Sequence, residues 1–261
     1  MSSSAKLHSA NSTRSGRLRI FGSFRALREA KIRKVLLSYF GVSLAIAAGA
    51  AFFFAWLSEE VLEKEFTQAS TNILLWIHSF ASPIMTEVAM FFTDLGSMIG
   101  IGVLSFALLL YLIRIKDRPL LYAFVGLMLG SLALVVLLKS AFQQIRPDVF
   151  TPLVIERTFS FPSGHSLMSF SFWGFIAWWI VDHNPKRLWR WCAAIVCVAI
   201  AVCVALSRLY LGVHWPTDVL AGMLLSMFWL SACVTAHEWV RRKERAAHIP
   251  GQGDTPVTPK P

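Results

Sequence analysis

Charged residues are scarce in this sequence, and that scarcity is the first constraint on its class. Only 15% of the 261 residues are Asp, Glu, Lys or Arg, whereas 56% are apolar. A soluble globular domain carries about a quarter charged residues, so this composition argues against one or two soluble domains. The apolar residues gather in long runs, which favours a single membrane unit with several spans.

Cysteine is also scarce, and its positions argue against the usual metal and redox motifs. No two cysteines form a CxxC pair, and all four fall inside apolar segments: Cys192, Cys197, Cys203 and Cys233. We interpret them as small packing residues. The polar connections contain no cysteine, so no disulfide is expected there.

Acidic residues are fewer than basic ones, and the chain carries a net charge of +10. Nucleic-acid binding is one explanation, but the basic residues gather in the N-terminal arm and in short loops between apolar runs. Residues 1–34 hold nine Lys or Arg and one Glu. This distribution suits membrane topology better, and no nucleic-acid partner is expected.

Six apolar segments approach the ~20 residues that a helix needs to cross a bilayer. The predicted fold class is therefore all-α, a six-span transmembrane helical bundle over residues 35–238. A basic, mostly disordered arm (1–34) is expected before it, and a basic and then disordered tail (239–261) after it. Residues 58–96 allow one or two interfacial helices or an early start to the second span. The predicted spans are about 35–57, 97–114, 119–138, 165–182, 189–207 and 217–237.

Positive charge marks alternate connections between these spans. The N-terminal arm is basic, and so are RIKDR at 114–118, PKRLWR at 185–190 and RRKER at 241–245. Because cytoplasmic loops are rich in Lys and Arg, all four are predicted to be cytoplasmic, with both termini inside. We expect a multi-pass protein of the plasma membrane. The remaining connections, 58–96, 139–164 and 207–217, are then extracytoplasmic.

Two of those extracytoplasmic connections hold nearly all of the unusual polar residues. Lys139 and Arg146 belong to one, and Arg208 and His214 belong to the other, with Asp218 just beyond it. Each residue alone has an ordinary explanation, such as a lysine that extends to the membrane surface. Together they place three cations and a carboxylate on one face of the membrane, which predicts an anion site. Asp148 and Glu156 are expected to be solvated loop charges.

The segment FPSGH at 161–165 lies directly before an apolar helix. Ser163 could simply cap that helix. However, Ser163 and Gly164 would also present backbone N–H groups at a helix start, where such donors lack partners and the helix dipole is positive. Gly164 would let an anion approach the backbone closely. The segment is therefore predicted to hold an oxyanion.

The histidines suggest what happens to that anion. His214 and Asp218 are four residues apart, so the carboxylate is expected to fix one imidazole nitrogen and leave the other as a nucleophile. His165, on another helix, would protonate the departing oxygen. The three cations would neutralise a transferring phosphoryl group. This set suffices for phosphate-ester hydrolysis without a metal or other cofactor. A zinc or iron site is the main chemical alternative, and the cations would repel it.

Three blocks of the sequence resemble the signature of the type 2 phosphatidic acid phosphatase family, which is related to the vanadium haloperoxidases. The blocks are KSAFQQIRP at 139–147, PSGH at 162–165 and SRLYLGVHWPTD at 207–218. The spacings K-x6-RP and SR-x5-H-x3-D are matched without a gap or a substitution. Signature and spans together cover about residues 82–237. The resemblance implies a helical bundle with its site at the outer membrane–water boundary, reached by lipid substrates from the bilayer.

The resemblance also implies the role of each residue. His214 would be the nucleophile that forms a phosphohistidine, Asp218 would orient it, and His165 would be the general acid. The phosphate would be bound by Lys139, Arg146, Ser163, Gly164 and Arg208. Substrates in the family include isoprenoid diphosphates such as undecaprenyl diphosphate, phosphatidic acid, phosphatidylglycerol phosphate and phosphorylated lipid A. The motifs bind only the phosphate, so they do not distinguish these lipids.

The expected function is thus an integral membrane lipid-phosphate phosphatase that needs no obligatory protein partner. A haloperoxidase with vanadate in the same pocket is the first alternative, but halide and diffusible oxidants need no bilayer. A non-enzymatic lipid binder or transporter is the second, but binding alone needs no nucleophile. A phosphotransferase that passes the phosphoryl group to another lipid also fits the residues.

Overall fold

The computed structural model describes residues 40–63 and 65–247, and the regular structure in this part of the chain is α-helical. The arm at 1–34 and the end of the tail at 248–261 lie outside the described residues. The chain divides into two compact units after Ala45, and the site and its supporting helices belong to the second unit. The helices are Phe40–Glu63, α2 (Thr67–His78), α3 (Pro83–Leu95), α4 (Met98–Ile115), α5 (Arg118–Phe142), α6 (Gly164–His183), α7 (Trp189–Tyr210) and α8 (Pro216–Ala247).

Five of these helices are long and apolar enough to cross a membrane: Phe40–Glu63, α4, α5, α7 and α8. They correspond to five of the six predicted spans, and the all-α membrane bundle is confirmed. The first helix, α5 and α7 each continue beyond the predicted apolar run. Lys139 and Arg208 therefore lie in the last turns of α5 and α7 rather than in loops.

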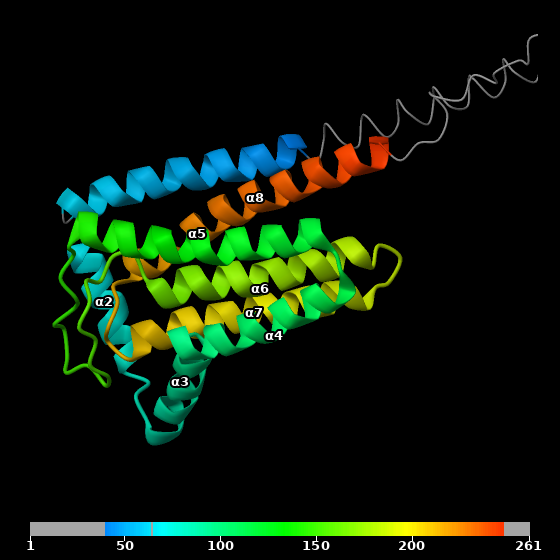
Figure 1. Cartoon of the computed structure of the whole chain (residues 1–261). Helices are drawn as coiled ribbons and strands as arrows, with labels where there is room; N and C mark the ends of the chain where they lie inside the picture. Colours follow the sequence, from blue (N-terminus) through cyan, green and yellow to red (C-terminus); the bar gives the residue numbers. More distant parts are fainter. Residues whose placement is uncertain (1–39, 64, 248–261) are drawn as a thin grey trace, which may run out of the picture. The chain divides into compact units, whose positions relative to one another are not determined.

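The remaining predicted span, 165–182, is α6, which has the length but not the apolar composition of the other spans. Figure 1 shows α6 among α4, α5, α7 and α8, and it packs chiefly on α7 and α8. Its buried face includes Ser166, Ser169 and Ser171, and the Ser171 hydroxyl contacts that of Ser131 on α5 at 2.9 Å. Neighbouring helices cover this polar face, so it does not require a continuous apolar surface.

Residues 67–95 form two helices, α2 and α3, separated by a bend of 118°. If this pair is counted as one broken span, the number of candidate spans rises to six. Ser82 caps α3 by accepting a hydrogen bond from the Met85 N–H at 3.3 Å. Tyr210, at the end of α7, contacts the Thr86 hydroxyl at 2.8 Å, which attaches α3 to the bundle.

The connections of the bundle fall into two groups at opposite ends (Figure 1). The loops at 143–163 and 211–215 lie at the end crossed by α2, together with the starts of α6 and α8. The short connections at 116–117 and 184–188 lie at the other end. This is the grouping predicted from the positive charges, and α8 carries the basic segment at 241–245 as helix. The side of the membrane that each end faces stays a prediction.

Candidate active site

The predicted site residues come from four helix ends and two loops at the end of the bundle crossed by α2 (Figure 1). Phe161, the first residue of the FPSGH segment, anchors this segment in the bundle. Its fully buried ring stacks on Phe54 of the first helix at a centroid distance of 6.0 Å and meets Phe142 of α5 at 4.8 Å. Aromatic packing of this kind fixes the position at which the chain enters α6.

His214 and Asp218 form the contact that their spacing predicts. The Nδ1 atom of His214 lies 3.1 Å from Oδ2 of Asp218, and both side chains are almost fully buried. The same Oδ2 accepts the backbone N–H of Trp215 at 2.8 Å. Pro216 begins α8 and Asp218 lies in its first turn, where proline and a negative charge are both favourable. Local helix-start chemistry therefore aims the carboxylate at the imidazole.

The second imidazole nitrogen faces a cation. Nε2 of His214 lies 3.3 Å from NH1 of Arg146. Burial, followed by the charges of Arg146, Arg208 and Lys139, lowers the pKa of His214 well below its usual value. A neutral ring with Nδ1–H donating to Asp218 and a lone pair on Nε2 facing the Arg146 guanidinium fits these two contacts. A neutral imidazole oriented by a carboxylate is the form that a nucleophile requires.

Ser160 is a member of the site that sequence reasoning missed. Its hydroxyl donates a hydrogen bond to Oδ2 of Asp218 and lies 3.4 Å from Nδ1 of His214. Its backbone carbonyl accepts a hydrogen bond from Nζ of Lys139 at 3.3 Å. The side chain is fully buried. Its place directly before FPSGH was the only signal available in the sequence.

Ser163 and Gly164 begin α6 as predicted, but their backbone groups are used differently. The Ser163 N–H donates to the backbone carbonyl of Asp218 at 3.0 Å, which joins the start of α6 to α8. The Ser163 hydroxyl accepts the Ser166 N–H at 3.4 Å, so this residue is the helix cap. Free donors for an anion at this helix start must therefore come from the residues after Ser163, which include Gly164 and His165.

His165 is half-buried at the second position of α6. It lies within electrostatic reach of His214 and of the cations Lys139, Arg146 and Arg208. The structure thus brings the two predicted catalytic histidines and the predicted phosphate-binding cations into one neighbourhood.

Arg146 holds the two loops of the site together. Its Nε donates to the carbonyl of Thr158 at 2.9 Å, and its NH1 donates to the carbonyl of Val213 at 2.5 Å. Burial lowers the pKa of Arg146, and the charges of Glu156 and Asp218 oppose this shift. A guanidinium stays charged in a protein even so. Arg146 therefore brings a fixed positive charge to His214.

Arg208 is the most deeply placed cation, with 2% of its surface exposed. Its NH1 donates to the hydroxyl of Thr93 on α3, and its NH2 donates to Oε1 of Glu156. Oε2 of Glu156 also lies 3.9 Å from NH2 of Arg146. The expectation that Glu156 is a solvated loop charge is therefore wrong, because its carboxylate bridges two arginines. The sequence contained a signal for this contact, because Glu156 is an acidic residue in a connection predicted to lie on the same membrane face as the three cations. Asp148 is exposed, as expected.

No three His, Cys, Asp or Glu side chains are grouped so as to hold a metal within residues 40–63 and 65–247. The residues that would bind an anion are instead the three cations and the start of α6. The arrangement can hold a tetrahedral oxyanion beside a neutral imidazole.

A cavity of about 770 Å³ adjoins the site. It lies between the end of the first helix, α2 and the loop that follows α5, and its wall is mixed polar and apolar. Its lining includes Arg146, which contacts His214, and Trp215, which follows His214 in the sequence. The cavity therefore offers room next to the nucleophile.

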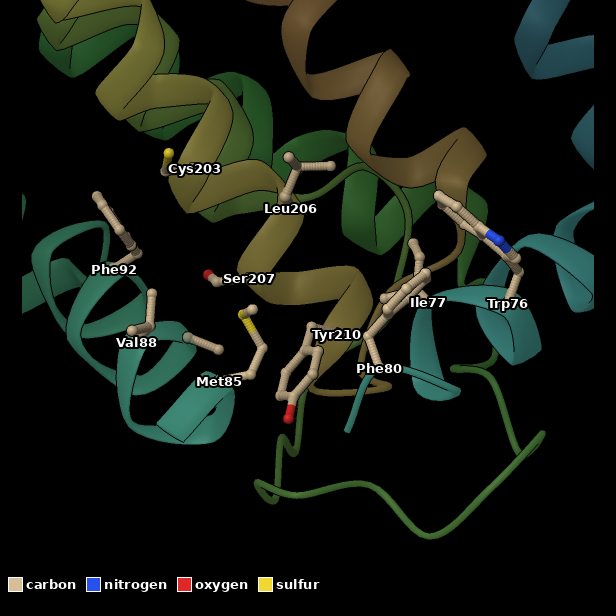
Figure 2. Close-up of a pocket in the computed structure, with 11 residues that line it drawn as sticks. Trp76, Ile77, Phe80, Met85, Val88, Phe92, Cys203, Leu206, Ser207 and Tyr210 are labelled. Atoms are coloured by element: carbon tan, nitrogen blue, oxygen red, sulfur yellow. The ribbon is translucent and has the colours of Figure 1, made fainter. Parts of the chain in front are cut away.

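A second, smaller groove lies between α2, α3 and α7 and is almost entirely apolar. Figure 2 shows its side chains, which include Trp76, Phe80, Met85, Phe92, Leu206 and Tyr210. Its volume is about 350 Å³. Ser207, which also lines it, directly precedes Arg208 in α7. An apolar groove thus begins one residue from a buried cation.

Comparison with known proteins identifies the signature. Residues 119–242 match the family model described as the PAP2 superfamily, which confirms the resemblance to the type 2 phosphatidic acid phosphatases. Over 95 residues the chain is 44% identical to phosphatidylglycerophosphatase B of Bacillus subtilis, covering 34% of this chain and 44% of that protein. Over 73 residues it is 42% identical to an undecaprenyl-diphosphatase of Sulfolobus acidocaldarius, covering 28% of this chain and 31% of that protein. The chain thus spans less than half the length of these relatives.

A solved structure is similar over a longer stretch. The crystal structure of a transmembrane PAP2-type phosphatidylglycerolphosphate phosphatase from Bacillus subtilis superimposes with a TM-score of 0.58 at 27% identity. The alignment covers 79% of this chain and 98% of that one. The helical arrangement around the site is therefore that of a PAP2 membrane phosphatase.

Proposed function

We propose that this chain, whose residues 119–242 match the PAP2 superfamily model, is a membrane phosphatase that hydrolyses a lipid phosphomonoester or diphosphate through a phosphohistidine. The observation that carries the proposal is the state of His214. One ring nitrogen is held by a buried carboxylate 3.1 Å away, and the other lies 3.3 Å from a guanidinium. A neutral, oriented imidazole among cations suits attack on an anionic phosphorus centre.

In the first step, Nε2 of His214 attacks phosphorus and the bond between phosphorus and the lipid oxygen breaks. His165 enters this step as the imidazolium, which the negative charge of the bound phosphate favours, and it gives its proton to that oxygen, so the lipid leaves as an alcohol or, from a diphosphate, as a monophosphate. In the second step, water attacks the phosphohistidine, and His165 accepts a proton from it. Phosphate leaves and neutral His214 is regenerated. Asp218 stays ionised and stabilises the imidazolium that each transfer creates.

Arg146 must shift when substrate binds. Its NH1 lies 3.3 Å from Nε2 of His214, in the position that phosphorus needs for attack. The phosphoryl group would enter between these two atoms, and Arg146 would then bind its equatorial oxygens together with Lys139 and Arg208. Cations aimed at the developing charge supply transition-state stabilisation.

The substrate is a lipid that reaches the site from the bilayer. Two features support this: candidate membrane spans on several sides of the site and the apolar groove beside Arg208 (Figure 2). The relatives are named as phosphatases of phosphatidylglycerophosphate and of undecaprenyl diphosphate, and these are the first lipids to test. The positive-inside rule supports an extracytoplasmic site in the plasma membrane, with both termini inside.

The test is phosphate release by the detergent-purified protein from a panel of lipid phosphates and diphosphates, with and without EDTA. The parallel variant is His214→Ala. We expect activity that survives EDTA and is lost in the variant, and the best substrate defines the lipid class. Absence of release from every lipid, in a preparation shown to be folded, would refute the phosphatase proposal.

A further inference from the structure

One carboxylate contacts two arginines from different parts of the active site: it accepts a hydrogen bond from Arg208 and forms a longer ion pair with Arg146. Glu156 lies in the loop between α5 and α6. Its Oε1 accepts from NH2 of Arg208 at the end of α7, and its Oε2 lies 3.9 Å from NH2 of Arg146 in the loop. Both arginines are assigned to the phosphate under the proposed function. In the structure these two arginines contact the carboxylate of Glu156.

A carboxylate resembles part of a phosphoryl group in the way it binds guanidinium. Both present two oxygens to the planar fork of N–H donors, and both make charge-assisted hydrogen bonds with it. Arg208 is 2% exposed, and a buried guanidinium without an anion is costly. Glu156 therefore removes that cost while the site is empty. The same donors cannot serve Glu156 and a phosphate fully at the same time.

The position of Glu156 lets it leave without rebuilding the site. Its side chain is 28% exposed, and the next residue toward the N-terminus, Ile155, is 91% exposed. The loop around it is attached by other contacts: the Leu153 N–H donates to the carbonyl of Leu211 at 3.0 Å, and Arg146 holds Thr158. A rotation of the Glu156 side chain toward water would free Arg208 while the loop stays attached.

We propose that Glu156 is a built-in competitor that an incoming phosphoryl group must displace from Arg208 and Arg146. It lowers the affinity of the site for phosphate in general, including the inorganic phosphate that hydrolysis leaves behind. Product then leaves more readily, and free phosphate in the medium inhibits less. The inference rests on the proposed function for the identity of the anion, but the competition itself requires no turnover.

A glutamate at this position could also have the opposite role, that of helping Arg208 to bind phosphate. If Glu156 serves to orient Arg208 for the phosphate, its removal weakens phosphate binding. If it competes, removal strengthens phosphate binding. The two roles predict opposite signs for one measurement, so that measurement decides between them.

The experiment measures the affinity of the full-length protein in detergent for inorganic phosphate, by calorimetry at constant ionic strength, and the inhibition constant of phosphate wherever a substrate is hydrolysed. Glu156→Gln keeps the size of the side chain and removes its charge. We expect phosphate to bind about tenfold tighter or more, since hydrogen bonds to charged groups are worth at least that factor. The matched control is Glu87→Gln, the same substitution at an exposed position of α3 that lines neither cavity, which should leave the affinity unchanged.

Weaker or unchanged phosphate binding in Glu156→Gln would overturn the inference. If this variant is unstable because Arg208 has lost its anion, phosphate should raise its melting temperature more than that of wild type; a smaller rise also overturns it. Glu156→Asp should bind phosphate with intermediate affinity, because the shorter side chain keeps the charge but cannot reach both arginines. If no lipid is hydrolysed and the affinities still shift as expected, the proposed function fails and the competition stands.

Discussion

Two acid–base contacts lie side by side in this site, and they are built in different ways. His214 and Asp218 are four residues apart, and neither side chain is more than 2% exposed. Arg208 and Glu156 are 52 residues apart, and the carboxylate is 28% exposed on a loop. The first contact is made locally where α8 begins and is sealed from water. The second joins a helix end to a loop and is open on one side. We call the His214–Asp218 contact the sealed pair and the Arg208–Glu156 contact the open pair. The sealed pair suits a catalytic contact that persists throughout the reaction, whereas the open pair suits exchange with an anionic ligand.

The largest effect should come from breaking the sealed pair. In Asp218→Asn the side chain keeps its size, but an amide nitrogen would face Nδ1–H or force the other tautomer. We expect kcat for lipid phosphate to fall by about 10³- to 10⁴-fold, as for a triad aspartate, with little change in KM. Steady-state phosphate release measures both constants. A fall in kcat of less than tenfold would mean that Asp218 does not control the tautomer of His214.

A smaller effect is expected from the support of the sealed pair. Ser160→Ala removes the hydroxyl that donates to Oδ2 of Asp218. Hydrogen bonds to charged groups are worth about 1.5–3 kcal/mol, so kcat should fall by about 10- to 100-fold. Ser160→Thr restores the hydroxyl and should recover part of the loss. Equal activity of the alanine and threonine variants would mean that the hydroxyl of Ser160 does not position Asp218.

A substitution in the apolar groove tests whether the hydrocarbon chain of the substrate binds in this groove, away from the sealed pair and the open pair. Leu206→Trp places a larger side chain in a groove of about 350 Å³ that Leu206 already lines. We expect KM for a long-chain lipid phosphate to rise by about fourfold for each methylene that the larger side chain excludes, since lost burial of one methylene costs about 0.8 kcal/mol. A short-chain soluble phosphate ester is the control, and its kinetics should not change. A proportional loss on both substrates would mean that the substitution disturbs the fold instead.

The smallest effect concerns stability at low pH. The pKa of His214 is lowered in the folded protein, whereas in the unfolded chain it is about 6.5. Below about pH 6.5 the unfolded chain therefore binds a proton that the folded site does not accept, and stability falls as pH falls. In His214→Asn this contribution is absent. Between pH 7 and 5 the melting temperature should fall less in the variant than in wild type; an equal fall would contradict a buried neutral His214.

The sequence predicted the sealed pair because its contact is local. Asp218 follows His214 by one turn across Pro216, and the start of a helix dictates how such a carboxylate folds back. The open pair was not predictable in the same way. The contacts of Thr93 and of Glu156 with Arg208 join segments that are distant in the sequence. The packing of α3 on α7 brings Thr93 to Arg208, and the loop between α5 and α6, which is attached to Leu211 through Leu153, brings Glu156 there.

The spans show the same limit. Apolar runs mark the residues that face lipid or an apolar core, so they located five helices well. They ended α5 and α7 too early, because Lys139 and Arg208 are polar yet lie in helices that extend into the site. The apolar run at 165–182 predicted α6 to be a span like the others, although neighbouring helices bury its serine face. The bend between α2 and α3 precedes a local helix start at Ser82 and Pro83, but the contact of Tyr210 with Thr86 that attaches α3 to the bundle joins segments distant in the sequence.

The most direct test of the account is to trap the covalent intermediate. The protein would be mixed with a lipid phosphate that carries radiolabelled phosphorus, quenched in alkaline detergent within one turnover, and digested for peptide mapping. The account predicts an alkali-stable, acid-labile label on the peptide that contains His214, and no label there in His214→Ala. A label on another residue, or turnover with no label on the protein at any time, would contradict His214 as the nucleophile.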